Sequence, residues 1–100
     1  MANKTAFLIM DMQVGCLSGH ALPPPFLPLL QRTLTSARSA AIPVIYITIA
    51  FRPGHPEISL QNATFGRAKQ ANLFVHGAPE TAIHEAIRPE EGDILVEKKR

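Results

Sequence analysis

Two charged residues stand at the ends of apolar runs, where they could carry out acid–base chemistry. Asp11 closes the apolar run at 6–10, and Lys98 follows the run at 94–96 with one residue between. A carboxylate can act as a general base, and an ammonium group can stabilise a neighbouring negative charge. The ends of these two runs are therefore candidate catalytic positions.

The surrounding pattern predicts the elements that must position these two residues. The continuous apolar run at 6–10 and the segment 93–97, which is apolar at 94–96, indicate buried strands. Residues 43–50, which are rich in β-branched side chains, indicate a third strand. Apolar residues recur at three- and four-residue spacing over 26–41, which predicts a helix that begins at Pro25 and ends before Pro43. A second helix is predicted over 79–87, and a short one near 67–73 within an irregular stretch.

Alternating strands and helices predict an α/β, Rossmann-like fold with a parallel sheet and flanking helices. In such sheets, ligands bind beyond the carboxyl ends of the strands. Asp11, Lys98 and the pair Phe51 and Arg52 all fall at those ends. A guanidinium group can hold a substrate carboxylate or carbonyl, so Phe51 and Arg52 are candidate substrate-binding residues. The alternative for each charge is a strand end that simply meets water.

Composition excludes several classes of function. The 100 residues are 46% hydrophobic and 18% charged, which suits one folded domain. The net charge is only +2 with no basic stripe, so no nucleic-acid partner is expected. No apolar run approaches the roughly 20 residues of a membrane span. A single cysteine, Cys16, favours a reducing compartment, and we expect a cytoplasmic protein.

Four segments resemble the isochorismatase-like cysteine hydrolases, in the family's order and at similar spacing. They are residues 7–13 (FLIMDMQ), 42–47 (IPVIYI), 51–57 (FRPGHPE) and 89–100 (PEEGDILVEKKR). The resemblance implies a hydrolase of amide-like or related small-molecule substrates that uses an Asp-Lys-Cys triad and no cofactor. Asp11 matches the family's aspartate, the general base, and Lys98 matches its lysine. It also implies strand order 3-2-1-4-5-6, so this single domain, 1–100, would supply the 3-2-1 half and lack its C-terminal half.

The family's nucleophile follows a later strand, within a stretch like Gly-Val-x-Thr-x-x-Cys-Val that these residues do not contain. Cys16 is the one thiol present, in the loop after the first strand, and an ordinary loop cysteine is the favoured interpretation over a substitute nucleophile. Nicotinamidases of the broader superfamily bind a metal through an aspartate and closely spaced histidines. Here His55 stands alone between prolines, so no metal site is expected. The other histidines are scattered: His20, His76 and His84.

Two functional hypotheses follow. The first is the hydrolase, with Asp11 and Lys98 present and the cysteine supplied elsewhere. The second is a non-catalytic fragment or interaction module that completes its sheet with a partner chain. An apolar strand left at a sheet edge is a template for pairing with another chain, so a homo-oligomer is expected.

Overall fold

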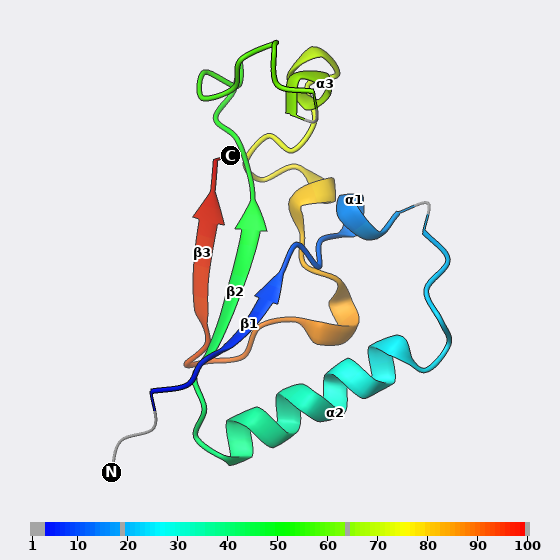
Figure 1. Ribbon diagram of the computed structural model, residues 1–100, viewed down its shortest axis with the longest axis vertical. Coiled ribbons are helices and arrows are strands. Elements are labelled where there is room, and N and C mark those ends of the chain that lie inside the picture. Colours follow the sequence, from blue (N-terminus) through cyan, green and yellow to red (C-terminus); the bar gives the residue numbers. More distant parts are fainter. Residues whose placement is uncertain (1–3, 19, 64, 100) are drawn as a thin grey trace.

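The computed structural model describes residues 4–18, 20–63 and 65–99. Figure 1 shows the strands side by side, with α2 near one end of the sheet and α3 near the other. In chain order the elements are β1 (Phe7–Met10), α1 (Val14–Leu17), α2 (Phe26–Ser39), β2 (Val44–Ile49), α3 (Phe65–Gln70), the 3-10 turns η1 (Pro79–Thr81) and η2 (Glu85–Ile87), and β3 (Ile94–Lys98). No helix in the described ranges is long and apolar enough to span a membrane.

The three strands form one parallel sheet in the order β1-β2-β3. Leu8 pairs with Ile45, and Ile45 pairs with Ile94, so the apolar runs lie in register. This confirms the predicted α/β fold and the half-sheet with β2 in the middle. All three arrowheads in Figure 1 point to the same edge, which is therefore the carboxyl edge of the sheet.

The main helix, α2, begins and ends where the sequence provides the signals. Pro25 precedes its first residue, where the fixed φ of proline suits a helix start. At the other end, Ile42 N–H bonds Ala37 O at 2.9 Å and Ala41 N–H bonds Arg38 O at 3.1 Å. Ala41 adopts a left-handed φ of 57°, which completes a Schellman stop before Pro43.

The predicted helix over 79–87 is wrong. This segment contains the two 3-10 turns η1 and η2, joined by an extended link. Ile83 in that link forms an antiparallel bridge with Gln13, and His84 N–H bonds Met12 O at 2.9 Å. Pairing with the chain that leaves β1 outweighs the local helical pattern, because tertiary context overrides propensity. We call residues 82–84 the strap.

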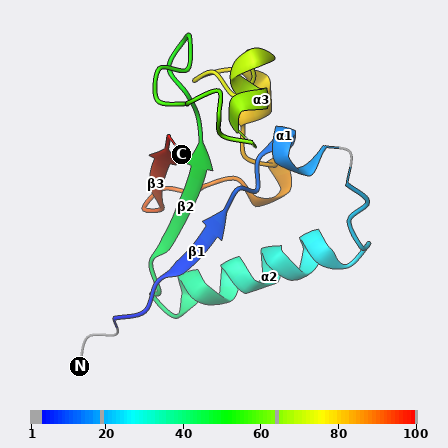
Figure 2. The ribbon, with the colours of Figure 1, turned by 45° about the horizontal axis from the view of Figure 1, so that its top comes forward.

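One of the two core clusters lies on one face of the sheet. Leu34 and Ala37 of α2 and Ile87 of η2 pack there against β1 and β2. The helix α2 and these two strands are labelled in Figure 2. The strand residues of this cluster are Ile9, Val44 and Tyr46.

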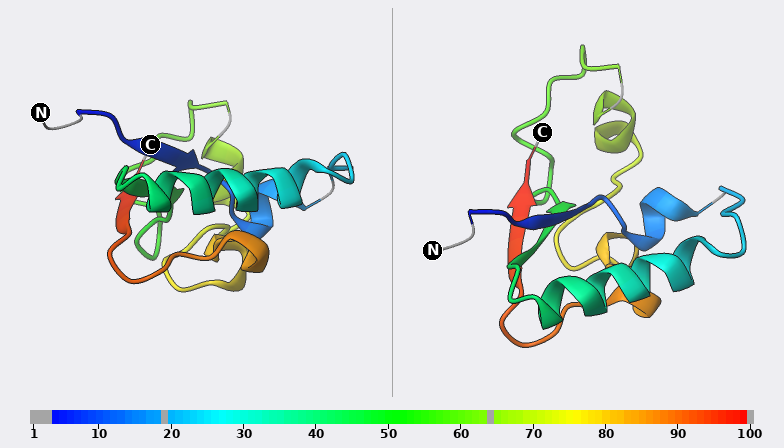
Figure 3. Two further views of the ribbon diagram at one scale, coloured as in Figure 1. Left: turned by 90° about the horizontal axis from the view of Figure 1, so that it is seen from below. Right: turned by 60° about the horizontal axis from the view of Figure 1, so that its bottom comes forward.

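On the opposite face only Ile49, near the carboxyl edge, is buried, where it packs with Ala68 of α3; the other aliphatic residues there have little cover among the described residues. Leu8, Met10, Ile94 and Val96 are each 45–48% exposed there. Seen from below, the helical segments extend to one side of the strands (Figure 3, left). We call the exposed side the open face; its aliphatic residues are Leu8, Met10, Ile45, Ile47, Ile94 and Val96.

Candidate active site at the carboxyl edge of the sheet

Asp11 lies where β1 stops following β2. Its N–H makes a ladder bond to Ile47 O at 2.9 Å, and its own φ is 59°, in the left-handed region. Asp enters that region more readily than most residues. The chain therefore turns away from β2 at Asp11 and runs to the strap, which leaves the carboxylate at the carboxyl edge of the sheet.

Lys98, the last residue of β3, reaches this carboxylate although β2 lies between the two strands. Its Nζ donates to Asp11 Oδ2 at 3.0 Å. The two predicted catalytic residues are thus brought together across 87 positions of sequence. The other carboxylate oxygen, Asp11 Oδ1, is buried and has no hydrogen-bond partner among the described residues. A buried oxygen without a partner is rare, and it leaves Asp11 an acceptor for a further proton donor.

Next to this ion pair is a cavity of about 340 Å³. Phe51 is fully buried in its wall, with its ring centroid 5.7 Å from that of Phe65. The wall is mainly apolar, and the ion pair supplies charge at one end. Its lining residues are Asp11, Gly15, Cys16, Ile49, Phe51, Phe65, Arg67, Ala68, Leu73, Phe74 and Lys98.

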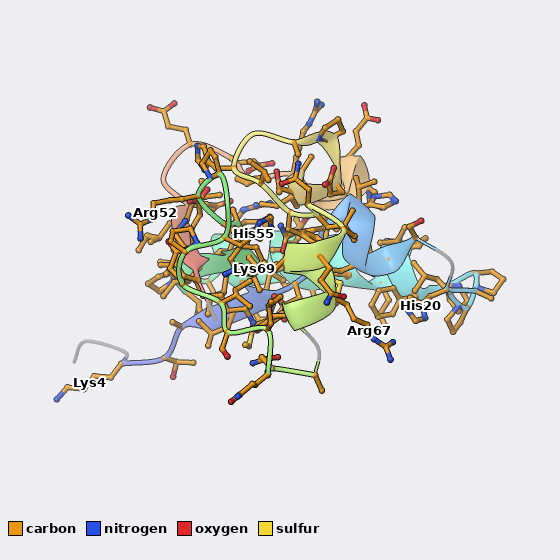
Figure 4. All side chains as sticks on the ribbon, turned by 90° about the horizontal axis from the view of Figure 1, so that it is seen from above. Lys4, His20, Arg52, His55, Arg67 and Lys69 are labelled. Carbon is orange, nitrogen blue, oxygen red and sulfur yellow. The ribbon has the colours of Figure 1, made fainter. Side chains whose placement is uncertain are left out.

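His55 fixes the loop that carries this wall. It is 1% exposed, its Nε2 bonds Leu73 O at 2.5 Å, and its ring lies 5.2 Å from that of Phe51. Phe51 N–H in turn bonds Phe74 O at 2.7 Å. Figure 4, which looks down on the carboxyl edge, shows His55 near the middle of the molecule. The imidazole therefore connects the segment after β2 to the segment after α3.

The arginine that lines the cavity is not the one that the sequence predicts. Arg52 bonds Glu57 Oε1 at 2.5 Å and is not among the residues that line the cavity. Arg67 of α3 does line it, at the rim. In Figure 4 the two side chains point outward on different sides of the molecule. The sequence analysis missed Arg67, Phe65 and Phe74. They lie well beyond the end of β2, and no strand-end pattern marks them.

Cys16 lies in α1 and lines the same cavity. Its thiol donates to Gln13 Oε1 at 3.9 Å. Burial raises the pKa of the Cys16 thiol and the Asp11 carboxylate raises it further, while Gln13 and Lys98 act in the opposite direction. A thiol with a raised pKa is protonated at neutral pH and is a poor nucleophile. This environment fits an ordinary loop cysteine.

The remaining histidines make local contacts. His84 Nδ1 accepts from Ala86 N–H at the start of η2, and His76 Nδ1 lies 2.9 Å from Glu97 Oε1 at the surface. Among the residues that the structure describes, no group of three or more His, Cys, Asp or Glu side chains could hold a metal ion.

Comparisons with known proteins agree with this geometry. Residues 5–100 match the family model for the isochorismatase domain. Among solved structures, a cysteine hydrolase from Pseudomonas syringae pv. phaseolicola 1448A superposes with a TM-score of 0.78 at 25% identity, over 95% of this chain and 46% of that chain. An isochorismatase family protein from Desulfovibrio vulgaris subsp. vulgaris str. Hildenborough gives a TM-score of 0.75 at 21% identity, over 99% of this chain and 54% of that one.

N-carbamoylsarcosine amidase from Thermoplasma acidophilum has the same fold, with a TM-score of 0.68 at 22% identity over 97% of this chain and 53% of that one. The chain thus spans about half the length of each of these structures. A search of curated proteins found no match. The match to the family model over nearly all of the sequence, together with the shared fold, shows that this chain belongs to the isochorismatase family.

Proposed function

We propose that this chain supplies the Asp-Lys part of a cysteine-hydrolase active site. Asp11 is the general base and Lys98 its charged partner. The substrate is an amide-like or related small molecule that enters the cavity beside them. The nucleophilic cysteine comes from polypeptide outside these 100 residues. The observation that carries the proposal is the 3.0 Å contact between Lys98 Nζ and Asp11 Oδ2, beside an apolar cavity.

The chemistry follows from the two oxygens of Asp11. Oδ2 is held by Lys98, while the buried Oδ1 has no partner among the described residues and can accept a thiol proton. The thiolate then attacks the substrate carbonyl, and the amine leaves with the proton that Asp11 returns to it. Asp11 next takes a proton from water, whose oxygen attacks the thioester. The C–S bond then breaks, the acid leaves, and the cysteine thiolate takes back the proton from Asp11. The Lys98 ammonium stabilises the negative charge on Asp11 and on the thiolate.

The test uses the protein as it is purified from the cells that make it, assayed against a panel of small amides. Asp11→Asn and Lys98→Ala should each reduce turnover by about 100-fold or more, the scale of losing a positioned acid–base group. Arg32→Ala, on the exposed side of α2, is the matched control and should retain activity. Full turnover in both site variants would refute the assigned roles.

A second function is favoured by the open face. The helix α2, which connects β1 to β2, and the turn η2, which precedes β3, both pack on the covered face. A right-handed connection from β3 to a new parallel strand beside β1 reverses direction, so it must cross the open face. The six aliphatic residues there suit such a segment or a partner chain. We therefore propose, as the alternative, an interaction module that completes its sheet with another chain.

The partner in this alternative is a second copy of the chain, which gives a homo-oligomer. Edge pairing through β1 and contact through the open face would remove both from water. Sedimentation equilibrium of the purified chain should then show a mass that rises with concentration. A single monomeric species across the concentration range would refute this alternative and leave the hydrolase. In either case we propose a cytoplasmic location, because a lone cysteine is typical of reducing compartments.

A further inference from the structure

The Gln13 side chain is fully buried two residues after Asp11, and each polar atom of its amide is used. Nε2 donates to Ile49 O and to Thr81 O, both at 2.8 Å. Oε1 accepts from Ile49 N–H at 2.8 Å and from the Cys16 thiol. One amide thus joins the end of β2, the turn η1 and the helix α1. Neither the ion pair nor the cavity explains why this position is glutamine.

The register of the sheet supplies the explanation. Phe7 N–H bonds Pro43 O and Asp11 N–H bonds Ile47 O, so β1 and β2 advance together. Parallel ladders repeat every two residues. If β1 continued straight, the backbone N–H of residue 13 would meet Ile49 O, and the carbonyl of residue 11 would meet Ile49 N–H. Instead, Gln13 Nε2 and Oε1 make those two contacts.

We propose that Gln13 is a positioning residue for Asp11. Its side-chain amide replaces the two backbone groups that β1 withdraws from Ile49 when the chain turns, and so holds Asp11 against Lys98. The end of β2 keeps both of its hydrogen bonds although the strand beside it has left. The backbone of residues 12–14 is free to pair with the strap, as it does at the Gln13–Ile83 bridge.

Without this amide, nothing would replace the two backbone hydrogen bonds that Ile49 loses when β1 turns away. A left-handed φ at a residue other than glycine is strained and persists only when its surroundings hold it. With Gln13 replaced by an apolar side chain, Ile49 N–H and O would be left buried without partners. Straightening of β1 would then satisfy them, because the backbone itself would complete the ladder. The Asp11 carboxylate would leave Lys98 as its φ became extended.

The importance of this role for catalysis rests on the proposed function. The effect of Gln13 on the position of Asp11 does not depend on that function. The experiment therefore measures the Asp11–Lys98 contact itself and not turnover, so that failure of one proposal is distinguishable from failure of the other. The probe is the nuclear Overhauser effect between the Asp11 Hβ and Lys98 Hε protons in isotopically labelled protein. The Asp11 Cα and Cβ chemical shifts report its φ region in the same spectra.

The test variant is Gln13→Met, which keeps the length of the side chain and removes its polar atoms. Gln31→Met is the matched control, because Gln31 Nε2 also donates to a backbone carbonyl, Ala86 O at 2.7 Å, away from the site. Gln13→Glu keeps the acceptor for Ile49 N–H and loses the donor to Ile49 O and Thr81 O, which provides a second variant.

In Gln13→Met the Overhauser contact should disappear and the Asp11 shifts should move toward extended values, while Gln31→Met keeps both. Gln13→Glu should weaken the contact. A folded Gln13→Met that retains the contact and the left-handed shifts would overturn the proposal. Unfolding of both Gln13 variants, with Gln31→Met folded, would also overturn it, because the amide would then be required for the fold as a whole.

Discussion

The two faces of the sheet have similar apolar sequences but different surroundings. On the covered face, Ile9, Val44 and Tyr46 are each at most 4% exposed beneath α2 and η2. On the open face, Leu8 and Met10 of β1 and Val96 of β3 are nearly half exposed. The strands were patterned for burial on both sides, as parallel sheets are. The covered face is thus buried within this chain. The open face stays exposed and, under the proposed functions, would contact other polypeptide.

The surroundings of Asp11 at the carboxyl edge also differ between its two sides. On one side lie Gln13 and the strap, where the Gln13 amide bonds Ile49 O and Thr81 O. The cavity beside Asp11 and Lys98 is closed by the segment at 65–74, while Asp11 Oδ1 still has no partner among the described residues. In the proposed hydrolase, a thiol from further polypeptide would lie at that oxygen. The exposed apolar face and the unpartnered oxygen are the two places where, under this proposal, that polypeptide would make contact.

The largest predicted effect contrasts one leucine on each side of the sheet. Leu34→Ala, at a position 2% exposed, should lower the free energy of unfolding by about 2–5 kcal/mol, since it leaves a cavity in the core. Leu8→Ala, on the open face at 46% exposed, should cost about 1 kcal/mol or less because little burial is lost. Urea unfolding followed by circular dichroism measures both. Equal losses would remove the distinction between the faces.

The next effect tests the polar network on the covered side. Asp93 Oδ2 lies 2.5 Å from Arg38 Nη2, and Arg38 also donates to Tyr46 Oη at 3.2 Å. Asp93→Asn should cost about 1–3 kcal/mol, the range for hydrogen bonds to charged groups. Glu90→Gln is the control, because Glu90 is an exposed partner of the same arginine at 3.5 Å and should change stability by less than about 1 kcal/mol.

This network also predicts a pH dependence of stability. Burial acts to raise the pKa of the Asp93 carboxyl, but the hydrogen bonds from Arg38 and from Glu90 N–H hold it below its ordinary value. A lowered pKa in the folded state means that the stabilisation is present above about pH 4 and is lost as the pH falls through the folded-state pKa. Urea unfolding of the wild type should therefore show this loss as the pH falls below about 4, and Asp93→Asn should show less of it. An identical pH dependence in both would contradict the assignment.

The smallest effect on stability belongs to the open face. Val96→Thr preserves shape and strand preference while adding a hydroxyl that water can reach. The free energy of unfolding of the monomer should change by less than about 1 kcal/mol. If the open face contacts another chain, the same variant should weaken association in sedimentation equilibrium. Thr33→Val, on exposed α2, provides the control for a change of one hydroxyl.

The sequence predicts the parts of this structure that local patterns determine. Apolar runs locate the three strands, and strand ends place Asp11 and Lys98 at one edge, because all parallel strands end on the same side. The predicted helix over 79–87 does not form, because residues 82–84 pair with a chain segment about seventy positions away. The sequence also does not predict the position of Arg67 at the cavity or the role of Gln13, for the same reason. The contacts of Gln13 with Ile49 and Thr81 span 36 and 68 residues and leave no local periodicity.

The most direct test of the central claim is a mass spectrum of the protein purified from its own cells, acid-quenched during turnover of a small amide, followed by peptide mapping. The claim is that Asp11 and Lys98 serve a cysteine from outside these 100 residues. It predicts an added acyl group on a cysteine other than Cys16, and loss of that adduct in Asp11→Asn. An acyl group on Cys16, or turnover with no cysteine adduct and no dependence on Asp11, would contradict it.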